Sequence, residues 1–307
     1  MGVWIDTDMG FDDIAAILVV AHSGLEIDGV SLIMGNTPLD QVRANAASAA
    51  AFFGWRFQIH SGRAMPVLCQ LETAEAILGS SGIPTLGRTL PAAERLPPGN
   101  AFAALCQWLE TNQGPCRILA LGPLTNIAAL ALARPDLAIR VTELVWMGGG
   151  VTSGNHTASA EFNAFADPEA LAIVLAHGLP LRMVDLDICR KVIATPEDVD
   201  ALRLVASEKA TLLADLLGGY VTIGTSRGRA GMALYDPTAA AIFVAPDIAD
   251  FRPARIDVEL QGSHTRGRTV VETRASRGIF NAHYVAGIDA ARARVIVMRA
   301  LADEASR

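Results

Sequence analysis

Four acidic side chains gather near the start of the chain, in the motif IDTDMGFDD. Asp6 and Asp8 stand two apart in an apolar segment, and on a strand such residues share one face. Asp12 and Asp13 follow Gly10 and open a segment with helical periodicity. The sequence therefore predicts that four carboxylates converge where a strand passes into a helix, and in open α/β sheets ligands bind at such a corner.

This acidic corner needs a compensating charge. Two carboxylates about 4 Å apart repel by ~4 kcal/mol at an effective dielectric of 20, whereas a helix N-terminus stabilises one carboxylate by only about 0.3–1 kcal/mol. Either some of the acids are protonated or a cation lies among them, and a hard divalent ion with oxygen ligands is the simpler hypothesis. The alternative is that Asp12 or Asp13 caps the helix while the other acids are solvated.

The elements that must position these acids alternate along the chain. Short β-branched or aliphatic runs predict strands at Val3–Thr7, Gly29–Met34, Phe57–His60, Arg117–Leu121, Glu143–Met147 and Leu181–Val184. Longer periodic segments predict helices at Phe11–His22, Leu39–Phe53, Ala101–Thr111, Leu124–Ala133 and Pro168–His177. This alternation predicts a Rossmann-like α/β fold, with a largely parallel, doubly wound sheet flanked by helices.

The pattern changes after Ala194. We expect, in chain order, helical stretches within Pro196–Leu217, a Gly/Arg-rich loop at Gly224–Gly231, a helix after Asp236, extended segments at Arg255–Leu260 and Thr269–Glu272, and a final helix at Gly287–Ala302. Region Gly79–Gly99 is rich in proline and glycine and is expected to be a surface excursion or a mobile flap. Since no Pro/Ser/Gly-rich linker divides the chain, we expect one domain over residues 1–307, with a small additional extended C-terminal segment.

Composition excludes several classes of function. The 307 residues carry 25 Lys and Arg against 32 Asp and Glu, a net charge of -7, so we expect binding to neither nucleic acid nor a membrane surface. The N-terminus shows no basic region followed by an apolar one, and the four cysteines form no C-x-x-C pair. These features predict a cytoplasmic protein with reduced thiols.

The spacing D-T-D-x-G-x-D-D resembles the signature of the nucleoside hydrolases of the inosine-uridine preferring type. Further motifs follow in that family's order: Gly35-Asn36, Leu124-Thr125-Asn126, Met147 to Gly150, Gly154-Asn155, Glu161-Phe162-Asn163, Asp236-Pro237 and LQGSHTRGRTVV at Leu260–Val271. The resemblance spans nearly the whole chain. It implies a calcium-dependent enzyme of purine or pyrimidine salvage that hydrolyses the N-glycosidic bond of ribonucleosides to free base and ribose, and it implies a homo-oligomer, a dimer or a tetramer.

The resemblance also implies roles for individual residues. Calcium would be held by Asp8, Asp13, Asp236 and the Thr125 carbonyl. Asp8 would be the general base for a metal-bound water, in a reaction that passes through an oxocarbenium-like transition state. Asp6 would support the site from behind. The nucleoside would be bound by Asp12, Asn36, Met147, Asn155, Glu161 and Asn163.

One part of the family pattern is missing. Tyr235 stands before Asp236, where many members carry a histidine near the leaving base, and Leu78-Gly79 replaces a His-Gly pair. Protonation of the leaving group then falls to Tyr235, whose ordinary pKa near 10 is high for this role. The other candidates are His156, as a proton donor, and the loop arginines Arg227 and Arg229, which would supply positive charge to a departing anionic base without giving up a proton.

Other interpretations of the same residues stay open at this point. In isolation Asn36 would be a turn residue, Met147 a core residue, and Glu161 and Asn163 part of a solvated strand face. At the level of function, the alternatives are a non-catalytic ribosyl-binding or calcium-binding relative and a magnesium phosphatase of the haloacid dehalogenase type. The phosphatase motif D-x-D-x-G accounts for less of the chain.

Overall fold

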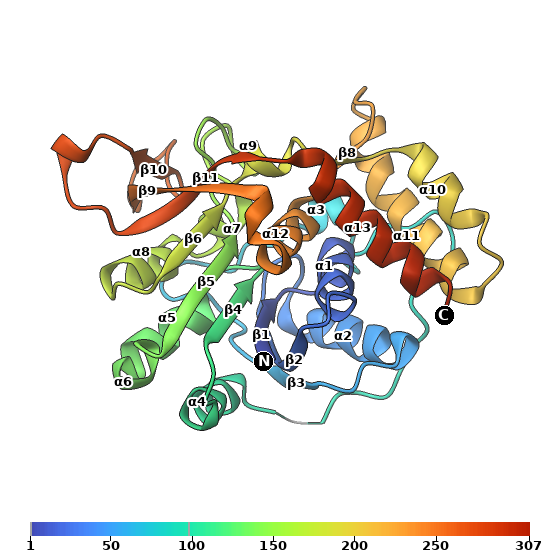
Figure 1. Ribbon diagram of the computed structural model, residues 1–307, viewed down its shortest axis with the longest axis horizontal. Helices are drawn as coiled ribbons and strands as arrows, with labels where there is room; N and C mark the ends of the chain where they lie inside the picture. Colours follow the sequence, from blue (N-terminus) through green and yellow to red (C-terminus); the bar gives the residue numbers. More distant parts are fainter. Residues whose placement is uncertain (1, 98) are drawn as a thin grey trace.

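One mixed sheet forms the centre of the molecule. The computed structural model describes residues 2–97 and 99–307, and within them nine strands pair in the order β10-β9-β11-β6-β5-β4-β1-β2-β3 (Figure 1). The strands are β1 (Gly2–Thr7), β2 (Glu26–Leu32), β3 (Gln58–Ser61), β4 (Cys116–Ala120), β5 (Val141–Met147), β6 (Leu181–Val184), β9 (Ala249–Val258), β10 (Thr269–Glu272) and β11 (Ala282–Ile288). All neighbouring pairs are parallel except the two that involve β9.

Helices cover both faces of this sheet. One face carries α1 (Phe11–Ala21), α2 (Leu39–Phe53), α12 (Tyr235–Val244) and α13 (Ala290–Ala305), and the other carries α4 (Ala101–Thr111), α5 (Thr125–Ala133) and α8 (Pro168–Ala176). Strand residues alternate between the two cores: Val3 and Ile5 pack in the first, and Trp4 packs in the second. The predicted doubly wound α/β fold is confirmed.

Shorter elements complete the chain. They are α3 (Glu75–Leu78), α6 (Pro135–Ala138), α7 (Phe162–Ala166), α9 (Leu186–Cys189), α10 (Pro196–Arg203), α11 (Glu208–Thr225), two 3₁₀ turns (Pro246–Ile248 and Ala275–Arg277) and an antiparallel pair formed by β7 (Ile193–Ala194) and β8 (Met232–Ala233). Within the described residues, no helix is both long and apolar enough to span a membrane.

Part of the predicted flap lies against α11. Residues 83–97 have no regular secondary structure, and residue 98 lies outside the described residues. The Leu86 N–H donates to the Asp215 carbonyl at 3.0 Å, and the Arg88 N–H donates to the Asp215 carboxylate at 2.8 Å. Gly219 of α11 permits this approach, because a Cβ there would lie 2.3 Å from the Thr85 nitrogen. A glycine pair inside a helix, which ordinarily destabilises it, is thus explained by packing.

The C-terminal prediction was partly wrong. The segment Thr269–Glu272 is confirmed as β10, and the segment Arg255–Leu260 lies in β9 only as far as Val258. Gly287 belongs to strand β11, and helix α13 begins only at Ala290. Strand β11 contains small residues and has a register irregularity between Val285 and Gly287. Its extended conformation depends on pairing with β6 and β9, which come from distant parts of the sequence, so local periodicity does not reveal it.

Candidate active site

The corner between β1 and α1 is built by its own backbone and side chains. Strand β1 ends at Thr7, so Asp8 lies in the turn. The prediction that Asp6 and Asp8 share one strand face is therefore wrong. Met9 has φ of 50°, in the left-handed region that residues other than glycine rarely adopt. The Thr7 hydroxyl accepts from the Met9 N–H at 3.1 Å and donates to Asp13 Oδ1 at 2.5 Å, while the Gly10 N–H donates to Asp13 Oδ2 at 2.7 Å.

Four carboxylates, from Asp8, Asp12, Asp13 and Asp236, form what we call the acidic cluster. Oxygens of Asp12, Asp13 and Asp236 lie within 4.8 Å of one another, and Asp8 is in hydrogen-bond contact with Asp13. Asp12 is partly exposed and the other three are buried. Asp236 comes from the first turn of α12, more than two hundred residues away in the sequence.

Burial and mutual repulsion govern the protonation of the cluster. Desolvation raises the pKa of all four carboxyl groups, and for Asp8, Asp12 and Asp236 the neighbouring carboxylates raise it further. The pKa of Asp12 reaches about 7. At neutral pH the cluster therefore holds protons or binds a cation, which are the two alternatives that the sequence left open.

Asn36 joins the cluster from the turn after β2. Its backbone N–H donates to Asp8 Oδ2 at 2.7 Å, and its side-chain amide donates to Asp8 Oδ1 at 3.0 Å and to Asp13 Oδ2 at 3.3 Å. Gly35 makes this possible, because a Cβ at that position would lie 2.0 Å from Asp8 Oδ2. Asn36 is thus a partner of the carboxylates rather than only a turn residue.

Asp6 lies behind this corner. It is fully buried, its Oδ2 accepts from the Ser31 hydroxyl and from Asn126 Nδ2 at 2.8 Å, and its Oδ1 has no partner among residues 2–97 and 99–307. Burial raises its pKa to about 7. Asn126 also donates to the Leu32 carbonyl at 3.2 Å, so this pair ties β1, β2 and the start of α5 together.

A second polar group follows β5. Glu161 caps α7, and its carboxylate accepts three backbone N–H groups at 2.8–2.9 Å, from Gly149, Asn163 and Ala164. The Asn163 amide donates to the carbonyls of Leu121 and Met147 at 2.8 and 2.9 Å. Both residues are buried, so the alternative interpretation, in which they lie on a solvated strand face, is wrong. Burial raises the pKa of Glu161 to about 7.

These two groups share the carboxyl edge of the sheet. The Leu121 N–H donates to the Asp6 carbonyl at 2.8 Å, and a Cβ at Gly122 would lie 3.5 Å from the Asp8 side chain. The turn after β4 therefore separates the acidic cluster from Glu161 and Asn163.

Asn155 and Thr125, which were expected to contact the nucleoside and the calcium ion, hydrogen-bond to other parts of the protein. Asn155 is exposed, and its side-chain oxygen accepts from the Phe162 N–H at 3.0 Å. Thr125 begins α5, and its hydroxyl donates to Asp167 at 2.6 Å. Asp167 also accepts from the N–H groups of Val67 and Ala170 at 2.9 and 3.0 Å. Both oxygens of Asp167 are thus hydrogen-bonded within the protein, which favours a structural role for it.

The candidate proton donors differ in setting. Tyr235 begins α12 with a partly buried side chain, and burial raises the pKa of its hydroxyl, which makes it a weaker acid. His156 packs against Phe162 and Phe165, with ring centroids 5.5 and 4.5 Å away, and burial lowers its pKa. This packing favours a structural role for His156.

Two further residues contribute to the site that the sequence motifs did not indicate. The Tyr220 hydroxyl from α11 donates to the Ala233 carbonyl at 2.8 Å and lies 3.3 Å from Asp12 Oδ2. Asn45 of α2 donates to the Met9 carbonyl at 3.1 Å and to the Ser81 carbonyl at 2.8 Å, so it links the unusual Met9 backbone to the flap. Asn45 interrupts an alanine-rich helix, a signal that could have found it, whereas nothing local marks Tyr220.

The fold and this corner define a doubly wound α/β protein with its polar site at the carboxyl ends of the parallel strands. Solved nucleoside hydrolases share this architecture. The chain is similar to a purine-preferring ribonucleoside hydrolase from Gardnerella vaginalis, with a TM-score of 0.91, 26% identity, and coverage of 100% of this chain and 99% of that one. It is also similar to an inosine-guanosine nucleoside hydrolase, with a TM-score of 0.87, 25% identity, and coverage of 99% and 98%.

Residues 3–300 match the family model of the inosine-uridine preferring nucleoside hydrolases, and the chain belongs to this family. Among characterised relatives, it is 32% identical to the pyrimidine-specific ribonucleoside hydrolase RihA of Salmonella typhimurium over 273 residues, which are 87% of each protein. It is 29% identical to the corresponding RihB of Escherichia coli over 272 residues, 87% of this chain and 86% of that protein. The predicted family and the class of hydrolases that act on N-glycosyl bonds are confirmed.

Proposed function

We propose that this protein hydrolyses the N-glycosidic bond of ribonucleosides in a calcium-dependent reaction that gives free base and ribose. The observation that carries the proposal is the acidic cluster at the carboxyl edge of the sheet. Oxygens of Asp12, Asp13 and Asp236 lie within 4.8 Å of one another, and the Asn36 amide donates to both Asp8 and Asp13. Membership of the nucleoside hydrolase family supports hydrolysis of an N-glycosidic bond. The acidic cluster supports the binding of a calcium ion.

The donor set fits a calcium ion. Asp8, Asp13 and Asp236 supply carboxylate oxygens, and the Thr125 carbonyl would complete the protein ligands, an all-oxygen set of the kind that calcium prefers. The raised pKa values show that the carboxylates are poorly compensated by the protein alone. When bound, the ion would neutralise this charge and lower the pKa of a nearby water.

Asp8 is the proposed general base. Its two oxygens already accept from Asn36, at 2.7 and 3.0 Å, which fixes the orientation of the carboxylate and leaves further lone pairs for a water proton. Asp12 is proposed to accept a hydrogen bond from a ribose hydroxyl. Its position is supported by Tyr220, whose hydroxyl lies 3.3 Å away.

The group after β5 is proposed to hold the rest of the nucleoside. Glu161, Asn163, Asn155 and Met147 would surround the ribose together with Asn36. Since the sugar gains positive charge as the base departs, carboxylate and amide oxygens around it stabilise the transition state more than the ground state. The backbone N–H groups that fix Glu161 hold its carboxylate in place for this role.

The similar proteins indicate which ribonucleosides should be tested as substrates. The names of the similar proteins include pyrimidine-specific and purine-preferring enzymes, so both base types must be tested. The cytoplasmic location, the single domain and the homo-oligomer stay predictions.

The proposal is tested by a paired assay on the purified protein. With calcium present, we expect release of free base and ribose from at least one purine or pyrimidine ribonucleoside, and no phosphate from a panel of phosphate esters. Phosphate release without ribose would favour the phosphatase alternative. Binding of ribose or calcium without turnover of any nucleoside would favour the non-catalytic relative.

Replacing Tyr235 tests the proton donor. We expect Tyr235→Phe to lower kcat about 10-fold or more for bases that leave poorly as anions and to change kcat little for 4-nitrophenyl riboside, whose leaving group needs no proton. The measurement is kcat for each substrate. An equal loss for all substrates would show that Tyr235 acts through packing. No loss for any substrate would favour charge stabilisation of the departing base by the loop arginines, with Arg227→Gln and Arg229→Gln as the next variants.

A further inference from the structure

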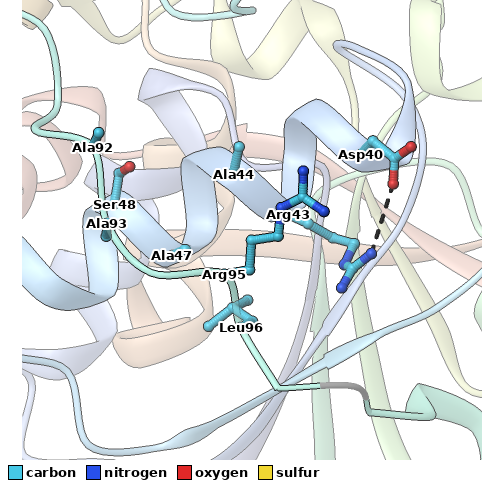
Figure 2. A pocket seen from close by; sticks show the side chains of 9 residues that line it. All are labelled: Asp40, Arg43, Ala44, Ala47, Ser48, Ala92, Ala93, Arg95 and Leu96. Carbon is cyan, nitrogen blue, oxygen red and sulfur yellow. Dashed lines mark ion pairs between the residues drawn. The ribbon is translucent and has the colours of Figure 1, made fainter.

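A cavity of about 350 Å³ lies between α2 and the extended segment 91–97, and none of its lining residues belongs to the acidic cluster or to the group after β5. It is open on one side, between the helix surface and the passing chain (Figure 2). The side chains that matter for its chemistry come from both walls: Asp40, Arg43, Ala44, Ala47 and Ser48 from α2, and Arg95 and Leu96 from the segment.

Two guanidinium groups reach this space. Figure 2 shows Arg95 extending from the segment towards α2, and Arg43 extending from α2 towards Asp40. Arg43 pairs with Asp40 at 3.6 Å, but the Asp40 carboxylate is 98% exposed, and exposed pairs of this kind are weak because water and salt screen them. In a chain of net charge -7, this is a local concentration of positive charge.

The arginines have unused hydrogen-bonding capacity. The Arg43 Nε is buried and has no hydrogen-bond partner among residues 2–97 and 99–307, whereas Arg95 is exposed to solvent. A buried N–H without an acceptor is unfavourable. A ligand with several acceptor oxygens would satisfy both arginines, and guanidinium groups bind phosphate and carboxylate oxygens two at a time.

The rest of the wall is apolar. Ala44, Ala47 and Leu96 present methyl groups, with the Ser48 hydroxyl as a further polar contact. A volume of this size matches a small organic molecule rather than a single ion. The two arginines outnumber the one acidic lining residue, Asp40, so the lining favours an anion. A phosphate monoester, with close to two negative charges at neutral pH, gains more from this than a carboxylate does.

From this combination we propose that the cavity binds a phosphate monoester whose organic part is small and either apolar or planar. The phosphate lies between Arg43 and Arg95, and the organic part lies against the alanine surface of α2. The site is separate from the proposed hydrolytic site and needs neither calcium nor turnover.

Isothermal titration calorimetry on the full chain tests this site, in a phosphate-free buffer that contains a calcium chelator. The probes are phenyl phosphate, inorganic phosphate and phenol. We expect saturable binding of phenyl phosphate, weaker binding of inorganic phosphate and the weakest binding of phenol. Arg43→Gln and Arg95→Gln are each expected to weaken phenyl phosphate binding by about 10-fold or more, the effect of losing a charged hydrogen-bond partner.

Matched variants separate this site from general charge effects. Arg299→Gln on α13 removes another helical arginine that has a weak intrahelical acid partner, at 3.7 Å, and should leave binding unchanged. Ala44→Leu narrows the apolar wall at an exposed helix position and should weaken phenyl phosphate while sparing inorganic phosphate. Thermal unfolding of each variant confirms that it is folded.

Three outcomes would overturn the proposal. They are the absence of saturable phenyl phosphate binding, binding that neither Arg43→Gln nor Arg95→Gln weakens, and equal affinity for phenyl phosphate and inorganic phosphate. The same titration with Asp8→Asn should give the wild-type affinity. This result is independent of whether the protein hydrolyses nucleosides.

Discussion

Asp8→Asn is expected to lower kcat for ribonucleoside hydrolysis by ~10³-fold, the usual effect of losing a general base. The physical reason is specific to the site. Asp8 accepts two hydrogen bonds from Asn36 and contacts Asp13, so an amide in its place keeps the shape but loses the capacity to take a proton. The measurement is kcat and KM on the best substrate of the panel, together with the affinity for ribose.

The matched control is Asp40→Asn, which removes a carboxylate that is 98% exposed and lies outside the acidic cluster. It should retain wild-type activity. A calcium titration of Asp8→Asn separates the two roles proposed for this residue. If a high calcium concentration restores kcat, Asp8 acts as a ligand only, and if Asp8→Asn turns over normally at any calcium concentration, the proposed mechanism is wrong.

Calcium should stabilise the folded protein, and the gain should grow as the pH rises from about 5 to about 8. The carboxyl groups of the acidic cluster have raised pKa values, about 7 for Asp12, so the folded, calcium-free state binds protons more tightly than the unfolded state does. The contribution of these groups to the stability of the calcium-free protein is therefore fully present below the unfolded pKa near 4 and is lost as the pH rises through the folded values. Calcium needs the deprotonated carboxylates, so its benefit appears over the same range of pH.

The measurement is the Tm with a chelator and with saturating calcium at each pH. A calcium concentration 100 times the Kd gives about 2.7 kcal/mol of stabilisation. Asp236→Asn should reduce the calcium gain. Asp185→Asn is the matched control, because Asp185 is also a buried carboxyl with a raised pKa, about 6, but lies outside the cluster. A Tm difference that is absent, or that is equal at every pH, would contradict calcium binding at this cluster.

Two groups outside the cluster should contribute to the same pH dependence. Burial raises the pKa of Asp6 and of Glu161 to about 7, and calcium does not reach either in the proposed arrangement. The chelated and calcium-bound proteins should therefore share a residual loss of stability towards pH 8.

The sequence alone determined the local structure of this protein, namely most of its strands and helices and the turn between β1 and α1. The β-branched run before Asp8, the Gly10 turn and the acids of the first helical turn predict the β1–α1 corner, because capping, turn and periodicity effects act over a few positions. The same short-range rules predicted six of the parallel strands and the helices between them. The family motifs added the order of the remaining site segments.

Only the tertiary structure decided how those segments meet. Asp236 completes the acidic cluster from α12, Tyr220 reaches Asp12 from α11, and Asn45 holds the Met9 carbonyl from α2. Strand β11 exists because β6 and β9 pair with it, and Glu161 became a helix cap because backbone N–H groups of α7 and Gly149 surround its carboxylate. These contacts join residues far apart in the chain, and their free energy depends on distances and burial that arise only when the sheet has brought its strand ends together.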